Sequence, residues 1–183
     1  MSAPADYFAL FSLPRRYELE REALEAAYER LTLAHHPDFF AAAPEAERQE
    51  AERTAAALNE GYRTLSDDFA RAAHLLGLLA GGRTLDTTAL PPGFLQEMFV
   101  LQEEVEELTE DAAAEARKGE LRIEANGRLE TVRAERENLF ARTAAGPDGA
   151  ADAAALQAIQ SNLNCERYLR RLLERLDGQR DDA

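Results

Sequence analysis

The spacing of apolar residues in the first third of the chain predicts two long helices. Downstream of Glu18, apolar positions recur three and four residues apart, the pattern of a helix with one buried face. These positions are Leu24, Ala27/Tyr28, Leu31 and His35. Pro37 ends this helix, because the residue before a proline is pushed out of the helical region. A second helix is predicted from near Pro44, with a stripe formed by Ala51, Ala55, Leu58, Tyr62 and Leu65. Two long helices joined by a proline turn favour an antiparallel hairpin.

Shorter helices flank this hairpin. The apolar segment "PADYFALFSLP" has the length of one brief helix. After the hairpin, Ser66-Asp67-Asp68 supplies capping residues for a helix over "FARAAHLLGLLAG". Gly81-Gly82 ends that helix, since glycine suits the left-handed conformation found at helix C-termini.

The remainder of the chain predicts a separate domain. The segment "GGRTLDTTALPPG" has the composition of a linker. Three helical patterns follow, from about Pro92 to Arg117, Glu120 to Thr143 and Ala151 to Asp177, with breaks at Lys118-Gly119 and "AAGPDGAAD". Short connections favour an antiparallel three-helix bundle. We therefore expect an all-α protein with an N-terminal domain over 1–80, a linker over 81–91 and a C-terminal three-helix domain over 92–183.

Composition and charge narrow the function classes. The formal net charge is −14, which argues against general nucleic-acid binding and against docking on anionic lipid, because both need clustered Lys and Arg. The single cysteine, Cys165, excludes an internal disulfide. Neither a signal-peptide pattern nor an apolar segment of about 20 residues is evident. We expect a soluble, cytoplasmic protein whose partners are other proteins.

Two histidines, a proline and an aspartate meet at the predicted end of the first long helix, in "LTLAHHPDFF". His35, His36 and Asp38 carry metal-binding atoms, but a zinc site takes at least three ligands and the sequence has no cysteine cluster to complete one. Acid–base catalysis needs a pocket and usually a nucleophile, and no motif for either is present. A plain turn is the simplest interpretation of His36, Pro37 and Asp38 taken alone.

The sequence around this tripeptide resembles a J-domain. "YERLTLAHHPDFF" is similar to the end of the second J-domain helix and its signature loop. "LNEGYRTLSD" resembles the third helix, with Asn59, Tyr62 and Leu65 at the expected places. The tripeptide is a weak signal by itself, but these pieces together are a strong one.

Further segments resemble the HscB type of J-protein, the co-chaperone of iron–sulfur cluster assembly. They are "DYFALFSLPRRYELE", "DDFARAAHLLGLLAG" with Arg71 and Ala72 matching, "FLQEMFVLQEEVEEL" and "NCERYLRRLLERL". The resemblance covers nearly the whole chain, and the pieces occur in the family's order.

The resemblance implies a function for the tripeptide. J-domains bind ATP-loaded Hsp70 and stimulate its ATPase, so the residues expected to contact an HscA-type Hsp70 are His36, Pro37, Asp38 and Arg30. Pro37 would keep the loop rigid while His36 and Asp38 present hydrogen-bonding groups at little entropic cost. The chain itself would be no enzyme, and it would need no cofactor and no metal.

The chain departs from the family pattern near this loop. Asp68 stands where a proline is expected before the "L-x-R-A" stretch. Phe39 follows the tripeptide where a basic residue is common, and Leu33 and Ala34 occupy basic positions late in the second helix, although Arg30 remains. Since a J-domain is expected to meet Hsp70 partly through basic charge, these departures bear on the strength of the contact.

The helix predicted after Pro92 has more apolar residues than a bundle core requires. Its core stripe is Phe94, Met98, Leu101, Val105 and Leu108. Leu95 and Phe99 lie on other faces, so they either pack on the N-terminal domain or form an exposed patch rimmed by acids, as protein-binding surfaces do.

The resemblance favours the patch. It implies binding of an IscU-type scaffold through Leu95, Gln96, Phe99, Val100, Glu103 and Glu107, with Tyr168 of the last helix supplying an aromatic ring. Gln96 stands where methionine is usual, and Val100 stands where an acid is usual. The alternative function is a J-domain adaptor that delivers a different client to Hsp70. Cys165 is predicted to be a small core or boundary residue, and His74 a helix residue near the domain junction.

Overall fold

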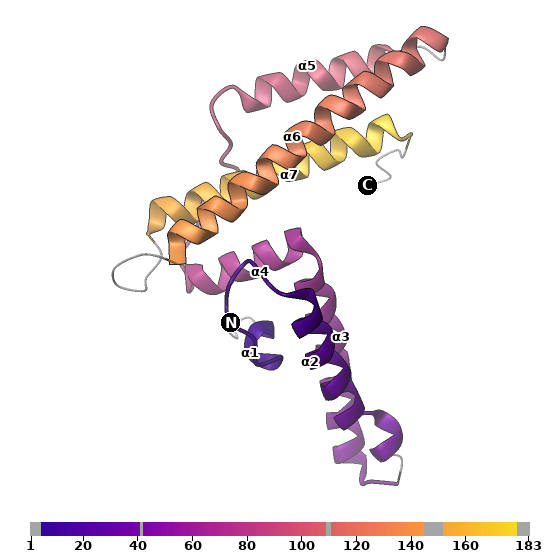
Figure 1. Ribbon diagram of the computed structural model, residues 1–183, viewed down its shortest axis with the longest axis vertical. Helices are drawn as coiled ribbons and strands as arrows, with labels where there is room; N and C mark the ends of the chain where they lie inside the picture. Colours follow the sequence, from indigo (N-terminus) through magenta and orange to yellow (C-terminus); the bar gives the residue numbers. More distant parts are fainter. Residues whose placement is uncertain (1–4, 41, 109–110, 145–151, 179–183) are drawn as a thin grey trace. The chain divides into compact units, whose positions relative to one another are not determined.

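The computed structural model describes residues 5–40, 42–108, 111–144 and 152–178. Over these ranges it contains helices and no strand, which confirms the all-α prediction. Its contacts group the chain into two compact units, Met1–Gly82 and Arg83–Ala183 (Figure 1). Within the described ranges, every helix is too short or too polar to cross a lipid bilayer.

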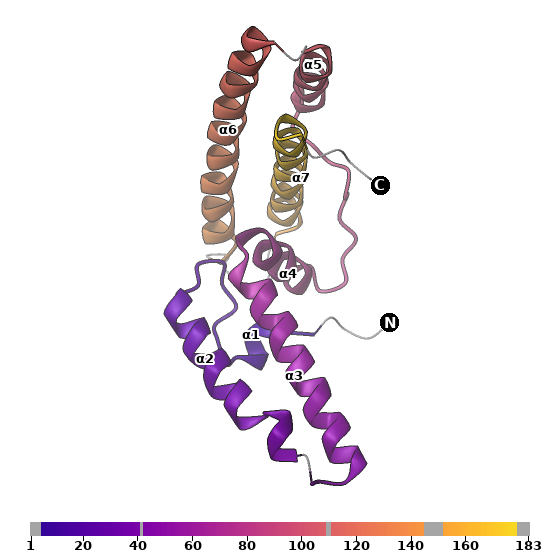
Figure 2. The ribbon, with the colours of Figure 1, turned by 90° about the vertical axis from the view of Figure 1, so that its right-hand side faces the viewer.

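Helices α2 (Arg21–Ala34) and α3 (Glu45–Ser66) form the predicted hairpin (Figure 2). Their stripes supply buried side chains to the core of the first unit: Leu24, Ala27, Ala51, Leu58 and Leu65. On one side of the hairpin, Tyr28 stacks on Tyr62 with 4.4 Å between ring centroids. The Tyr28 hydroxyl also donates a hydrogen bond to Asn59 Oδ1 at 2.7 Å, so the two helices are joined by polar as well as apolar contacts.

The brief helix α1 (Tyr7–Leu10) packs on α3 at a glycine. A Cβ atom at Gly61 would lie 2.9 Å from Cε2 of Phe11 and 3.0 Å from Cδ1 of Tyr7. Any larger residue would therefore push these rings away from α3. Phe8 and Phe11 are fully buried, and the close approach at Gly61 lets them fill the core.

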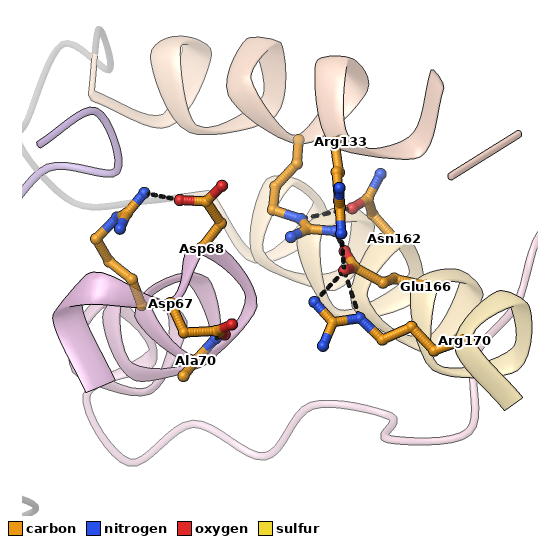
Figure 3. Close-up of polar contacts among 9 residues, drawn as sticks. Asp67, Asp68, Ala70, Arg133, Asn162, Glu166 and Arg170 are labelled. Atoms are coloured by element: carbon orange, nitrogen blue, oxygen red, sulfur yellow. Dashed lines mark hydrogen bonds and ion pairs between the residues drawn. The ribbon is translucent and has the colours of Figure 1, made fainter. Parts of the chain in front are cut away.

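Helix α4 (Asp68–Ala80) has the termini that the sequence predicts. The Asp67 side chain accepts the backbone N–H of Ala70 at 2.7 Å, an N-cap that Figure 3 shows. Gly81 ends the helix in the left-handed region at φ 57°. Glycine adopts this conformation without the steric cost that a Cβ atom brings.

A buried arginine explains the departure at Asp68. The Arg71 guanidinium donates hydrogen bonds to the carbonyl oxygens of Tyr17 at 2.9 Å and Leu65 at 2.6 Å. It also forms an ion pair with Asp68, the first residue of α4. Proline at this position would favour the helix start by its fixed φ, whereas Asp68 favours it through the helix dipole and supplies a counterion to Arg71.

His74 joins α4 to α1. Its Nε2 accepts the backbone N–H of Tyr7 at 3.2 Å, and its ring stacks on the rings of Tyr7 and Phe8. Burial lowers the pKa of His74 below its usual value of 6.5, because a proton on the ring would be poorly solvated. His74 therefore contributes to the core of the first unit as a neutral acceptor.

The second unit is built on α7 (Ala153–Leu176), against which α5 (Phe94–Glu107) and α6 (Ala112–Ala144) both pack (Figure 1). Its core includes two clusters of buried side chains among the described residues. One contains Leu121, Ala125, Leu172 and Leu176, and the other contains Met98, Leu129 and Leu169. The predicted core stripe of α5 packs in these clusters, so that prediction is confirmed.

The predicted break at Lys118-Gly119 is wrong. Helix α5 ends at Glu107, and α6 runs through both residues. Asp111 Oδ1 accepts the N–H groups of Ala113 and Ala114 at 2.9 Å each, so the cap lies seven residues earlier. A glycine inside a helix costs about 1 kcal/mol, which the packing of α6 on α7 outweighs. The break predicted at "AAGPDGAAD" falls mostly outside the described residues.

Part of the expected linker is hydrogen-bonded to α7. Gln157 exchanges two hydrogen bonds of 2.9 Å with the backbone of Asp86. The Asn164 side-chain amide donates to the carbonyl oxygens of Thr87 at 3.0 Å and Ala89 at 2.9 Å. Asn164 is buried, and these bonds satisfy an amide that would otherwise be costly to place there.

A buried carboxylate joins α7 to α6 in the second unit (Figure 3). Glu166 and Arg136 are both fully buried and form an ion pair between α7 and α6. The other Glu166 oxygen accepts from Arg170 Nε at 2.8 Å and lies 3.6 Å from an Arg133 nitrogen. Arg136 Nε also donates to Asn162 Oδ1 at 3.0 Å. One buried carboxylate therefore balances the buried Arg136 and two arginines, Arg133 and Arg170, that reach the surface.

Replacement of Glu166 by glutamine should strongly destabilise the second unit. The neutral amide removes the negative charge that pairs with the buried Arg136 guanidinium, and breaking a buried ion pair costs about 3–5 kcal/mol. Urea unfolding of the full chain, followed by circular dichroism, measures this loss. Glu174→Gln is the matched control, because Glu174 is an exposed residue of the same helix, and it should change stability by no more than about 0.5 kcal/mol. Equal effects of the two variants would contradict the role of the cluster.

The first unit should lose stability in mild acid through His74. Because its pKa is lowered in the folded chain, the unfolded chain binds the proton more readily, and this contribution is lost as the pH falls below 6.5. The melting temperature of the full chain, measured from about pH 7.5 to about pH 5.5, should therefore decrease. His74→Gln keeps an acceptor for the Tyr7 N–H but cannot be protonated, so its melting temperature should depend less on pH. An unchanged slope in that variant would assign the effect to another group.

Candidate protein-binding sites

The His36-Pro37-Asp38 tripeptide lies at the end of the α2–α3 hairpin. Helix α2 ends at Ala34, where the N–H of His35 still donates to the carbonyl of Leu31 at 3.0 Å. A short 3-10 turn, η1 (Pro37–Phe40), follows and packs on α3 (Figure 2). It begins where the sequence predicts that the helix is interrupted. The side chain of Pro37 lies outside the described residues.

His36 and Asp38 direct opposite hydrogen-bonding groups to solvent. The backbone N–H of Asp38 donates to His36 Nδ1 at 3.3 Å. In a neutral imidazole, Nδ1 as acceptor leaves the proton on Nε2. The side chains of His36 and Asp38 are 46% and 87% exposed. The tip of the hairpin thus presents a donor on the ring and an acceptor on the carboxylate, and the fold itself makes little use of either.

Arg30, the fourth residue expected at this surface, is exposed on α2. Two other exposed side chains near the loop are apolar: Leu33 in the last turn of α2 and Phe39 in η1. The sequence shows that these positions lack the basic residues of the family pattern. It does not show that the apolar replacements remain exposed, because that depends on how η1 packs against α3.

The proposed scaffold-binding residues of α5 lie away from the core. Phe99 and Val100 are 56% and 63% exposed. Gln96, Glu103 and Glu107 are also exposed, whereas Leu95 is half-buried. The exposure of two large apolar side chains on one helix is unusual in a folded chain, and the flanking glutamates give the patch an acidic edge.

Tyr168 approaches this helix from α7. Its ring meets the ring of Phe94 edge-on, with 6.1 Å between centroids, and packs against the cluster around Met98. Tyr168 is half-buried, so part of the ring stabilises the bundle and part reaches the surface. The structure brings it next to the start of α5, directly before Leu95 in sequence.

A shallow groove lies beside Val100, and the sequence does not predict it. Its volume is about 310 Å³, and its lining consists of Gln96, Glu97, Val100, Leu101 and Arg128. Arg128 comes from α6 and donates to Glu97 at 3.0 Å. The groove thus lies between α5 and the Arg128 side chain of α6, and no single sequence pattern predicts that these two helices meet there.

Cys165 is buried on α7, as the sequence predicts. Burial raises the pKa of its thiol to about 11, because the thiolate would lose its hydration. The thiolate is the reactive form of cysteine, so Cys165 is a packing residue. Among the residues that the structure describes, no three histidine, cysteine or acidic side chains are grouped so as to share a metal ion.

Comparison with known proteins identifies the family. No family model matches the chain. The chain is 34% identical over 170 residues to a Burkholderia thailandensis protein named "Co-chaperone protein HscB homolog", and the alignment covers 91% of each. It therefore belongs to the HscB co-chaperone family. A second HscB homolog, from Paraburkholderia phymatum, is 35% identical over 94% of this chain and 96% of its own length. An alignment with the HscB homolog of Azoarcus sp. reaches 43% identity but spans 58% of that relative.

Solved structures agree with this assignment. The HscB chaperone of Vibrio cholerae superimposes with a TM-score of 0.75 at 28% identity, over 95% of this chain and 96% of that one. The human co-chaperone HscB shares the fold, with a TM-score of 0.77 at 21% identity over the whole chain and 86% of the human one. The HscB family resemblance inferred from the sequence is confirmed.

Proposed function

We propose that this HscB-family chain is a J-domain co-chaperone of iron–sulfur cluster assembly in the cytoplasm. It binds an IscU-type scaffold through its second unit, residues 83–183, and delivers the scaffold to an HscA-type Hsp70. Its first unit, the J-domain, binds the Hsp70 and stimulates ATP hydrolysis. The chain performs no chemistry itself, in keeping with relatives that are named co-chaperones.

The observation that carries this proposal is the exposure of His36 and Asp38 at the end of the hairpin. The exposed Asp38 carboxylate and the exposed part of the His36 imidazole are available to another protein. Because the Asp38 N–H bond orients the imidazole, the loop loses little conformational entropy on binding. Binding of this loop would favour the hydrolysis-competent state of Hsp70, a coupling between the two proteins.

The exposed face of α5 supports the second interface. Phe99 and Val100 offer apolar area for burial, and Glu103 and Glu107 offer a charged rim. Apolar centres with polar edges are typical of protein interfaces. Because both interfaces belong to one chain, a bound scaffold is held at a high effective concentration near the Hsp70.

Asp38→Asn should abolish stimulation of the Hsp70 ATPase, and His36→Gln should do the same. Both residues are exposed, so circular dichroism should show an unchanged helical content. Steady-state ATP hydrolysis by the HscA-type Hsp70 measures the effect, with and without scaffold. Full stimulation by either variant would contradict the proposed role of the loop. Stimulation that is indifferent to scaffold would instead favour delivery of a different client.

The double variant Leu95→Ala/Phe99→Ala should weaken scaffold binding, by about tenfold or more. Truncation of two central apolar side chains removes contacts worth roughly 1–2 kcal/mol each. Isothermal titration calorimetry of the full chain with the scaffold measures the dissociation constant. Ile123→Ala is the matched control, because Ile123 is an exposed apolar residue of α6 outside the proposed patch. An unchanged affinity in the double variant would place the site elsewhere.

A further inference from the structure

Large apolar side chains stand exposed on both sides of the loop. Within the described residues, the exposed large hydrophobic side chains are Leu33, Phe39, Phe99, Val100 and Ile123. Leu33 precedes His36 by three residues, and Phe39 directly follows Asp38. Each is 68% exposed. Two of the five thus fall beside one short turn, which makes this a second candidate apolar surface, separate from the face of α5.

The same turn that orients His36 also positions Phe39. The N–H of Phe39 donates to the carbonyl of His36 at 3.0 Å, and the two rings meet edge-on with 6.1 Å between centroids. On α2, Leu33 lies one turn after Arg30, on the same exposed face. Each of the two apolar side chains therefore lies beside a proposed Hsp70-binding residue, Phe39 beside His36 and Leu33 beside Arg30.

This surface carries little positive charge. Helix α2 contains two arginines against three glutamates, so its formal side-chain charge is −1. Arg21 is already paired with Glu25 at 2.9 Å, and the last turn of α2 contains no basic residue. The charged residue of η1 is Asp38. Electrostatic attraction to a carboxylate-rich partner is therefore weak, and direct opposition of like charges would cost affinity.

We infer, on the basis of the function proposed above, that this chain docks on its Hsp70 mainly by apolar contact. Leu33 and Phe39 pack against aliphatic or aromatic side chains of the Hsp70, next to the place where His36 and Asp38 act. Burial of apolar area supplies the affinity that basic residues would otherwise supply. Such a contact depends only weakly on salt, whereas attraction between exposed charges is screened.

The test compares two double variants of the full chain, Leu33→Ser/Phe39→Ser and Leu33→Lys/Phe39→Lys. The chain concentration that gives half-maximal stimulation of the HscA-type Hsp70 ATPase is measured for each, at about 50 mM and about 300 mM salt. Both variants should raise this concentration by about tenfold or more. For the unsubstituted chain it should change by no more than about twofold between the two salt conditions.

The lysine variant discriminates between an apolar and a carboxylate-rich surface on the Hsp70. If the Hsp70 presents carboxylates opposite Leu33 and Phe39, new lysines strengthen binding and make it sensitive to salt, which would overturn the inference. An unchanged half-maximal concentration in the serine variant would overturn it as well. Ile123→Ser is the control, since it removes an apolar side chain of greater exposure, 76%, from the other unit, and it should leave stimulation unchanged.

A separate measurement distinguishes failure of this inference from failure of the proposed function. If the unsubstituted chain does not stimulate the Hsp70 at all, the proposed function is wrong and the inference with it. If the chain stimulates and Asp38→Asn removes the effect, the function holds, and only the response of the serine and lysine variants decides the nature of the contact. Thermal unfolding of both variants should match that of the unsubstituted chain, because the substituted side chains are largely exposed.

Discussion

The second unit depends on the surface of α7. Both α5 and α6 pack on this helix, and the segment around Thr87 is hydrogen-bonded to Asn164, which α7 also carries. At its centre, the paired charges of Glu166 and Arg136 must stay together, because separation of either from the other in a dry interior is far more costly than the loss of one apolar contact. Apolar packing can slide from one register to another, whereas this ion pair fits only one. The ion pair therefore fixes how α6 is aligned along α7.

In the first unit, the exposed loop is separate from the contacts that form the small core. The rings of Phe8 and Phe11 reach α3 only because Gly61 has no side chain, and Arg71 links the start of α4 to the loop before α2. These contacts lie away from the hairpin tip. His36 and Asp38 are therefore open to selection for binding, because the core does not require them.

Most of the fold could be predicted from the sequence, since amphipathic helices and their caps are local features. The apolar stripes of α2 and α3, the cap at Asp67 and the end at Gly81 follow from residue spacing and type. The start of α6 could not be placed in this way, because Gly119 resembles a helix break until the packing on α7 is known. Residue spacing alone does not single out Glu166. It lies three residues from each of the buried Leu163 and Leu169, and a lone acid among buried leucines of one helix is a signal for a buried partner.

The candidate sites, too, could be predicted only in part from the sequence. Motif resemblance proposes His36, Asp38 and the α5 residues as candidates, but their exposure depends on tertiary contacts. The groove at Arg128 requires knowledge of which helices touch, and the exposure of Phe39 requires the geometry of η1.

The apolar side chains beside the loop also affect how copies of this chain meet one another. Exposed Leu33 and Phe39 would promote self-association in a neutral protein, because contact between two such surfaces removes apolar area from water. A net charge of −14 opposes this, since each copy repels the next before the apolar surfaces come within reach. The acidic composition therefore opposes self-association through Leu33 and Phe39. Their exposed apolar area stays available for a different partner.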